Sequence, residues 1–293
     1  MWAFLSQPAG FDIGETGLLI YDATQPLWRA FMVGLGNTLR VSLPALLATC
    51  VIALVVALCR TSRVPLWRAL GSLYVDVVRN TPLLLQLLMW YFLLVEWLPD
   101  STAAIRLLPG VWLSKGGLAF PWYGPAEDAD GLAMGHAPWQ WSWPQQDTFN
   151  VVGGAAVTPE FLALALALSV YTGAFLAEVI RGGIESVPAS LMEAAETLGA
   201  TRWQQIVQVL LPQALRTIVP AASNQFLNLV KNSSLAVAVG YPDLVSVGNT
   251  AINQTGRALE CLLVMMAVYL LLSVLTSVLM NWFNARYALR GVT

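Results

Sequence analysis

Long apolar runs separated by short polar stretches set the pattern of this chain. Three of the runs contain no charged residue, and they are residues 41–59, 161–177 and 261–285. An α-helix needs about 20 mainly apolar residues to cross the hydrocarbon core of a bilayer. These runs therefore predict three transmembrane helices.

Two further runs give a weaker signal. Residues 80–95 are uncharged but short, and residues 217–230 are more polar and continue past Lys231. Counting both, we expect five transmembrane helices, at residues 34–59, 69–98, 159–181, 210–235 and 259–284. The predicted fold class is an all-α integral membrane protein, with a transmembrane domain at residues 34–284.

The composition supports a membrane protein and argues against other classes. Of the 293 residues, 57% are hydrophobic and only 11% are charged, whereas a globular chain carries about 25% charged residues. The apolar excess needs lipid as its solvent, so a soluble enzyme is not expected. The net charge of −2, without a Lys/Arg cluster, also argues against a nucleic-acid partner.

The positive charges predict the topology. The connection after the first span holds Arg60, Arg63, Arg68 and Arg79 against only Asp76, which marks it as cytoplasmic. Alternation then places the N-terminus outside and the C-terminus in the cytoplasm. The resulting segments are an external arm at 1–33, an external insertion at 99–158, a cytoplasmic loop at 186–212 and a cytoplasmic tail at 285–293.

The external insertion at 99–158 is rich in Pro, Gly and Trp. Indole rings are favoured at the membrane–water interface. We therefore expect an irregular cap that rests on the membrane surface, and a lid over a pore is the alternative.

The cytoplasmic loop carries signals for two short helices. Residues 190–193 and residues 201–204 each fit a capping box, and Gly199 between them can take the left-handed conformation that ends a helix. The second helix is expected to run to Pro212. The simpler interpretation of the loop is an ordinary connection between two capped helices.

The same loop resembles a known motif. Glu193-Ala194-Ala195, three residues, Gly199, nine residues and Val209-Leu-Leu-Pro212 resemble the EAA loop of ATP-binding-cassette (ABC) importer permeases. Only Val209 departs from the pattern, which has Ile there. The resemblance implies that Glu193, Ala194, Ala195, Gly199, Val209 and Pro212 couple the chain to an ATPase.

The resemblance extends over residues 30–285, and it is to the polar and general L-amino-acid branch of these permeases. It rests on Gly36-Asn37-Thr38-Leu39, on residues 79–83, 178–183 and 228–235, and on residues 240–251. For residues 79–82, a helix start anchored by Arg79 is an alternative to a role in gating.

Two features depart from the family. Relatives commonly have Gly-Gln where this chain has Ser190-Leu191, so the local contacts of the loop are expected to differ. Members of the general amino-acid subgroup usually begin with an extra hydrophobic span, which residues 1–33 lack. Either the sequence starts inside a longer chain or five spans suffice.

The resemblance implies a type I importer in the bacterial inner membrane. Its partners would be an ATP-binding subunit dimer, a second permease subunit in a heterodimer, and a periplasmic amino-acid-binding protein. The chain itself has no G-x-x-x-x-G-K-[ST] phosphate loop, so ATP and Mg are expected on the partner subunit. The chain is then a transport subunit without catalytic residues or cofactors of its own.

A polar stripe in the fourth predicted span is the candidate substrate path. Asn224, Asn228 and Lys231 lie at helical spacing, followed by Asn232 and Ser233. An ionisable residue within a span usually faces a cavity, a pathway or a partner. Contact between subunits is the alternative interpretation for these residues.

One alternative function is less well supported by the sequence. An ion-coupled secondary transporter or channel, acting without an ATPase, normally needs buried acidic or His relays, and none is visible. The only histidine, His136, and the three cysteines have no metal-site spacing. We therefore expect no metal site, and no role for His136.

Overall fold

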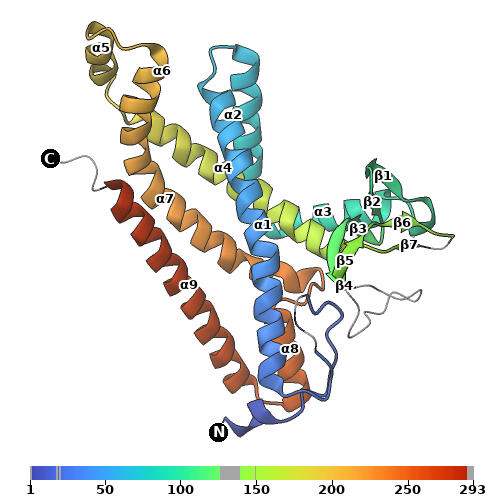
Figure 1. Ribbon diagram of the computed structural model, residues 1–293. Helices are drawn as coiled ribbons and strands as arrows, with labels where there is room; N and C mark the ends of the chain where they lie inside the picture. Colours follow the sequence, from blue (N-terminus) through green and yellow to red (C-terminus); the bar gives the residue numbers. More distant parts are fainter. Residues whose placement is uncertain (1, 18, 20, 126–138, 149, 289–293) are drawn as a thin grey trace. The chain divides into compact units, whose positions relative to one another are not determined.

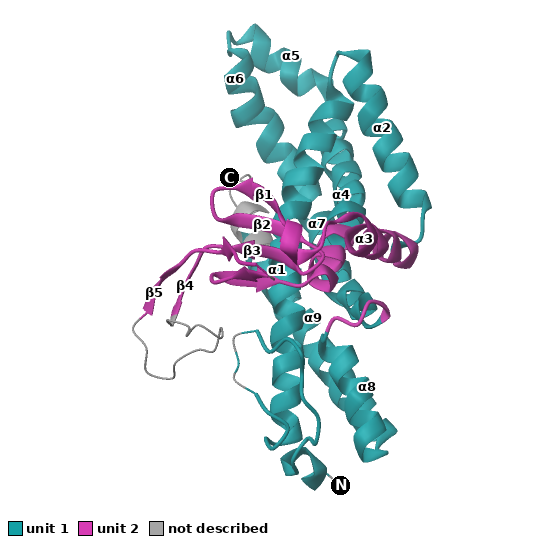
Figure 2. Ribbon diagram, turned by 90° about the vertical axis from the view of Figure 1, so that its right-hand side faces the viewer, with its two compact units in different colours: residues 1–83, 168–237, 242–293 teal, residues 84–167, 238–241 magenta. Residues whose placement is uncertain are grey.

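A computed structural model describes residues 2–17, 19, 21–125, 139–148 and 150–288. His136 and the prediction made for it lie outside these residues. The chain divides into two compact units, coloured separately in Figure 2. Unit 1 holds residues 1–83, 168–237 and 242–293, and unit 2 holds residues 84–167 and 238–241.

Unit 1 is helical. Its main helices are α1 (Leu27–Thr61), α2 (Pro65–Asn80), α4 (Pro159–Glu185, from residue 168), α5 (Ala189–Thr197), α6 (Arg202–Gln204), α7 (Leu211–Asn232), α8 (Leu244–Thr255) and α9 (Ala258–Ala288). The 3₁₀ turns Ala3–Ser6 (η1) and Ser233–Ala238 (η4) complete it. In Figure 1 the corner of α5 and α6 lies at the same end of unit 1 as the α1–α2 connection, and residues 2–26 lie at the other end.

The predicted spans largely agree with these helices. Within the described part of the chain, four helical stretches are long and apolar enough to cross a membrane, and α2 with α3 (Leu83–Trp97) counts as a fifth span if the pair is joined. The expected helix at 69–98 is therefore interrupted. Pro82 disfavours helical geometry at the residue before it, and Thr81 accordingly has φ −106° and ψ 136°.

Helix α8 was not predicted, because it lies between the expected spans at 210–235 and 259–284. Asp243 caps the helix by accepting a hydrogen bond from the Ser246 amide at 2.9 Å. Gly256 ends the helix in the left-handed conformation, with φ 67°. Asp before the first turn and Gly after the last are the usual helix boundaries, so the sequence did contain this signal.

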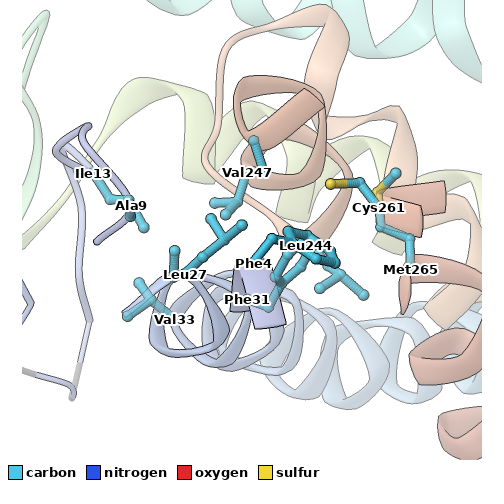
Figure 3. Close-up of a cluster of buried hydrophobic side chains, with 12 residues drawn as sticks. Phe4, Ala9, Ile13, Leu27, Phe31, Val33, Leu244, Val247, Cys261 and Met265 are labelled. Carbon is cyan, nitrogen blue, oxygen red and sulfur yellow. The ribbon is translucent and has the colours of Figure 1, made fainter. Parts of the chain in front are cut away.

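Two hydrophobic clusters hold unit 1 together. In the first, the N-terminal arm, α1, α8 and α9 meet through Phe4, Phe31, Leu244 and Met265 among others (Figure 3). The second joins α1, α2, α4 and α7 through Ala53, Val75, Val78, Ala174, Leu176, Ala177 and Ala222. The many alanines allow these helices to approach closely, as is common in membrane proteins.

Unit 2 contains the insertion at residues 99–158, whose described part is not irregular as expected. It holds the 3₁₀ turn Ser101–Ala103 (η2) and the strands β1 (Ile105–Leu108), β2 (Val111–Ser114), β3 (Gly117–Phe120), β4 (Trp122–Pro125), β5 (Trp139–Ser142), β6 (Gln145–Gln146), β7 (Val151–Val152) and β8 (Ala155–Val157). Four strands form an antiparallel sheet in the order β1-β2-β3-β8.

A glycine turn shows why proline- and glycine-rich sequence folds into strands here. Gly117 has φ 109°, and a Cβ on it would lie 2.0 Å from the Val157 carbonyl oxygen of β8. Only glycine allows β3 and β8 to approach at this point. The short apolar runs between such turns are long enough to form strands. The residue composition of the insertion alone did not reveal these strands.

Strands β4 and β5 form a separate two-stranded ribbon with an aromatic face. Tyr123 pairs with Trp141, and Trp139 lies two residues before Trp141 on β5, so these three side chains share one face. The Tyr123 ring lies 5.7 Å from each of the two indole rings, and all three rings are exposed.

Candidate functional site

The loop at residues 186–212 folds as a two-helix corner made of α5 and the helix that begins at Arg202. Gly199 has φ 79°, which confirms the left-handed turn predicted for it. Thr201 and Gln204 form a reciprocal capping box, also as predicted. The box predicted at Ser190 and Glu193 is wrong, since α5 begins at Ala189 with Pro188 at the N-cap and no side-chain cap.

Hydrogen bonds fix the angle of this corner. The Ala200 amide donates to Ala195 O at 3.0 Å, and the Gly199 amide donates to Glu196 O at 2.9 Å. This pair of bonds is a Schellman motif. The buried Gln205 side chain then donates to Ala200 O at 3.0 Å, so the second helix holds the turn from the other side.

The outer surface of the corner is open. Glu193 and Ala194 of the EAA motif are exposed, and Ala195 is half-buried. Two large apolar side chains that the sequence analysis did not single out lie beside the turn: Leu198 is 88% exposed and Trp203 is 73% exposed. Their positions on either side of Gly199 are the feature of the sequence that could have identified them.

The second helix of the corner does not end at Pro212 as predicted. A π-helical segment (η3, Gln205–Leu210) leads directly into α7, where Pro212 occupies the first turn. Proline lacks an amide hydrogen and its ring crowds the preceding turn, which a widened π turn relieves. Val209 is half-buried in this segment and Pro212 is exposed.

The polar stripe lies on an open face of α7. Asn224, Asn228 and Lys231 are all exposed, which places them together on one side of the helix. Asn232 is half-buried, whereas Ser233 is fully buried and donates to Val230 O at 2.7 Å. Three of the five candidate path residues therefore share a surface, and Ser233 lies on the opposite side.

Lys231 also lines a groove of about 710 Å³ in unit 1. Its other lining residues with polar groups are Ser234, Asn249 and Tyr269, and leucine and methionine side chains of α9 supply most of the remainder. One ammonium with neighbouring hydroxyl and amide groups in an apolar groove can bind a carboxylate that carries a hydrophobic substituent.

A polar network lies in unit 1 beside the first hydrophobic cluster. The side-chain amide of Asn37 donates to Glu15 O at 2.7 Å and to Pro242 O at 2.9 Å. Thr38 Oγ1 accepts from the Leu244 amide at 3.2 Å. These contacts give a structural reason for the Gly-Asn-Thr-Leu motif, because Asn37 and Thr38 join α1 to the start of α8.

Asp243, the N-cap residue of α8, is the acidic member of this network. Its side chain is fully buried, and Tyr269 donates to it at 3.4 Å. Burial raises the pKa of Asp243 to about 6, although hydrogen bonds from Ser246, Val245 and Tyr269 oppose the rise. The Asp243 carboxylate is therefore held in its charged form at neutral pH at a cost in stability.

Comparison with known proteins identifies relatives along nearly the whole chain. Residues 49–289 match the family described as binding-protein-dependent transport system inner membrane component. The general L-amino acid transport system permease protein AapQ of Rhizobium johnstonii is 37% identical, over 98% of this chain and 84% of that protein. The putative amino-acid ABC transporter permease protein YhdX of Escherichia coli is 38% identical, over 98% of this chain and 85% of that protein.

The fold also matches a solved structure. The chain is similar to a crystal structure of an amino acid ABC transporter with histidines, with a TM-score of 0.63 and 25% identity. The match covers 88% of this chain and 94% of that chain.

Proposed function

Since the chain belongs to the family of binding-protein-dependent transport system inner membrane components, we propose that it works as follows. It is a multi-pass permease subunit of an ATP-driven amino-acid importer in the bacterial inner membrane, and not an enzyme. The amino acid comes from a periplasmic binding protein, and a separate subunit dimer hydrolyses ATP with Mg. Residues 1–33 and 99–158 lie outside, and residues 186–212 and 285–293 lie in the cytoplasm.

The observation that carries the proposal is the open polar face of α7. This face presents Asn224, Asn228 and Lys231 from a helix long and apolar enough to cross the membrane. A lysine and two amides are costly against lipid, so another protein chain or water must cover them. A second, related permease subunit that meets this face encloses a polar path between the two chains.

The two-helix corner is the proposed ATPase contact. Leu198 and Trp203 are large apolar side chains that a solvated loop has no reason to expose so fully. Glu193 and the exposed Ala194 lie on the neighbouring helix, where they offer charge to a basic partner and a flat surface for close approach. Apolar anchors with a charged border are typical of protein–protein contacts.

The groove at Lys231 is the proposed point of contact with substrate. The Lys231 ammonium binds the α-carboxylate of the amino acid, and Asn228 and Asn232 satisfy other polar atoms. The apolar lining from α9 accepts side chains of varied shape. Because all amino acids carry this carboxylate, recognition through it allows a broad range of substrates.

The aromatic face of the β4–β5 ribbon is the proposed membrane-surface contact of the insertion. Tyr and Trp rings with polar tips are favoured among lipid headgroups, and β4 and β5 carry no charged residue. Brominated lipids in nanodiscs should quench Trp139 and Trp141 fluorescence. If the double variant Trp139→Gln with Trp141→Gln shows the same total quenching as the wild-type protein, this contact is excluded.

Co-purification tests the proposed function. The chain is co-expressed with its neighbouring reading frames, isolated through an affinity tag and transferred into lipid nanodiscs. We expect recovery of an ATP-binding subunit together with a second permease of related sequence. Recovery of the chain alone, active in vesicles without ATP, would support the ion-coupled alternative and overturn the proposal.

A further inference from the structure

Glu178 occupies a junction between α1 and α4. Its carboxylate forms an ion pair with Arg60 in the last turn of α1. It also accepts from Arg181 Nη2 at 2.9 Å, and Arg181 in turn pairs with Glu185. The Arg60 and Glu178 side chains are only 14% and 20% exposed.

This junction lies on α4, the helix that leads into the two-helix corner. Helix α4 ends at Glu185, and only residues 186–188 separate it from α5. The links are short, since the Ser186 amide donates to Gly182 O at 3.0 Å and the Val187 amide donates to Ile184 O. A displacement of α5 therefore moves the end of α4 rather than being absorbed in a loop.

The end of α4 is also packed tightly against two other helices. A Cβ on Gly183 would lie 2.3 Å from a side-chain carbon of Ile218 in α7, and the Arg79 guanidinium of α2 lies 4.9 Å from the Phe175 ring centre. The α7 and α2 contacts are steric or cation–π in nature. Among the described residues, the direct ion pair from this end of α4 to α1 is Glu178 with Arg60, and Glu185 of the same helix end attracts Arg60 from farther away.

A partly buried ion pair suits the transmission of movement. If Glu178 is displaced or removed, the partly buried Arg60 loses its direct ion-pair partner in a poorly solvated place. Helices α1 and α4 are therefore driven to move together where Glu178 meets Arg60. Signals between distant sites require a contact of this kind, whose free energy differs between two arrangements.

We propose that Glu178 is a positioning residue for transport, which carries the movement of α5 through α4 into α1 by its ion pair with Arg60. The inference rests on the proposed function, in which α5 contacts the ATPase. Glu178 touches neither substrate nor nucleotide. Its role is to make α1, and the external contacts of α1, respond to the state of the cytoplasmic corner.

The test uses the complete importer with its binding protein in proteoliposomes, with radiolabelled L-glutamine as the transported probe. ATP hydrolysis and uptake are measured in parallel, and their ratio is the readout. Glu178→Gln and Arg60→Gln should each lower the amount imported per ATP by about tenfold, in the range of typical coupling free energies. Glu185→Gln is the comparison variant, because it removes a charge from the same helix end that pairs directly with Arg181 and acts on Arg60 only through a longer-range attraction.

Two further variants separate coupling from simple destabilisation. Arg60→Lys keeps the charge and should retain most of the wild-type ratio. The double variant Glu178→Gln with Arg60→Gln should be no worse than either single variant, because both remove the same contact. Additive losses in the double variant, an unchanged ratio in Glu178→Gln, or an equal loss in Glu185→Gln would each overturn the inference. Uptake by the wild-type complex, measured beside these, tests the proposed function separately.

Discussion

The Asn37 side chain and the Pro242 carbonyl join two segments 205 residues apart, through a hydrogen bond of 2.9 Å. The same amide group also holds Glu15 O of the N-terminal arm. Asn37 is only 1% exposed, so loss of its side chain leaves two half-buried carbonyl acceptors without this donor.

Asn37→Ala should therefore destabilise the chain by about 1–3 kcal/mol, the usual cost of unmade hydrogen bonds at buried groups. Thermal unfolding of the purified complex in nanodiscs measures the effect. Asn80→Ala is the control, since that exposed amide bonds only within its own helix. Equal melting temperatures for both variants would show that the Asn37 link does not stabilise the fold.

Asp243 gives a pH-dependent prediction. Its folded-state pKa of about 6 lies above its ordinary value of 3.8, so the folded state binds the proton more tightly. The stability contributed by the neutral form is present below pH 3.8 and is lost as the pH rises through 6. Above pH 6 the free energy of unfolding stays lower by a constant amount of about 3 kcal/mol.

Asp243→Asn should then raise stability at pH 7.5, because asparagine caps a helix nearly as well and carries no charge. The gain should shrink as the pH falls to 5, where the wild-type Asp243 is mostly protonated. Melting temperatures of both proteins at pH 5, 6 and 7.5 provide the measurement. A gain that stays constant with pH would contradict a raised pKa at Asp243.

Gly199 sets the angle of the cytoplasmic corner through its backbone alone. A Cβ there meets nothing within 4 Å, so the cost of a side chain comes only from φ 79°. Gly199→Val should cost about 1 kcal/mol or more, and should turn α5 away from its place. We expect membrane insertion to persist while ATP hydrolysis no longer drives uptake.

Gly182→Ala is the matched control for Gly199→Val, because its Cβ also meets nothing and its φ is not positive. Binding-protein-stimulated ATPase activity and uptake are measured for both variants. Normal values for Gly199→Val would mean that the corner is a plain connection.

Leu198 and Trp203 should anchor the ATPase. Leu198→Ser with Trp203→Ser should weaken ATPase binding by at least about 2 kcal/mol, as loss of central apolar anchors does. Co-purified ATPase per permease, measured at increasing dilution, reports the change. Trp97→Ser is the control, since Trp97 is equally exposed at the far end of α3. Unchanged retention of the ATPase would exclude the two side chains from the contact.

Lys231 tests the substrate path. Lys231→Met removes the ammonium but keeps much of the side-chain volume, and should abolish uptake without loss of assembly. Lys231→Arg should retain part of the uptake because it still offers a cation. Normal uptake by Lys231→Met would leave Lys231 with a packing role between subunits.

Much of this fold could be predicted from the sequence. The apolar runs identified the long helices because lipid forces backbone groups into helices, and Gly199 with the Thr201–Gln204 box located the cytoplasmic corner. What the sequence did not reveal depends on tertiary context. The strands of the insertion are too short for a periodic signal, and α8 was hidden inside what looked like a connection.

The candidate sites were predictable to different degrees. The spacing of Asn224, Asn228 and Lys231 correctly placed them on one face. Ser233 follows in sequence but lies buried, because the chain changes to a 3₁₀ turn there. The Arg60–Glu178 ion pair joins residues from different helices, and no local pattern encodes such a contact.

The central claim is that ATP hydrolysis by a partner drives amino-acid import through this chain. Proteoliposomes containing the full complex, with ATP inside and binding protein with radiolabelled L-glutamine outside, test it most directly. We predict uptake that requires ATP and binding protein, persists when ion gradients are collapsed, and is lost in Gly199→Val. Uptake that proceeds without ATP, or that stops when the gradients collapse, would contradict the account.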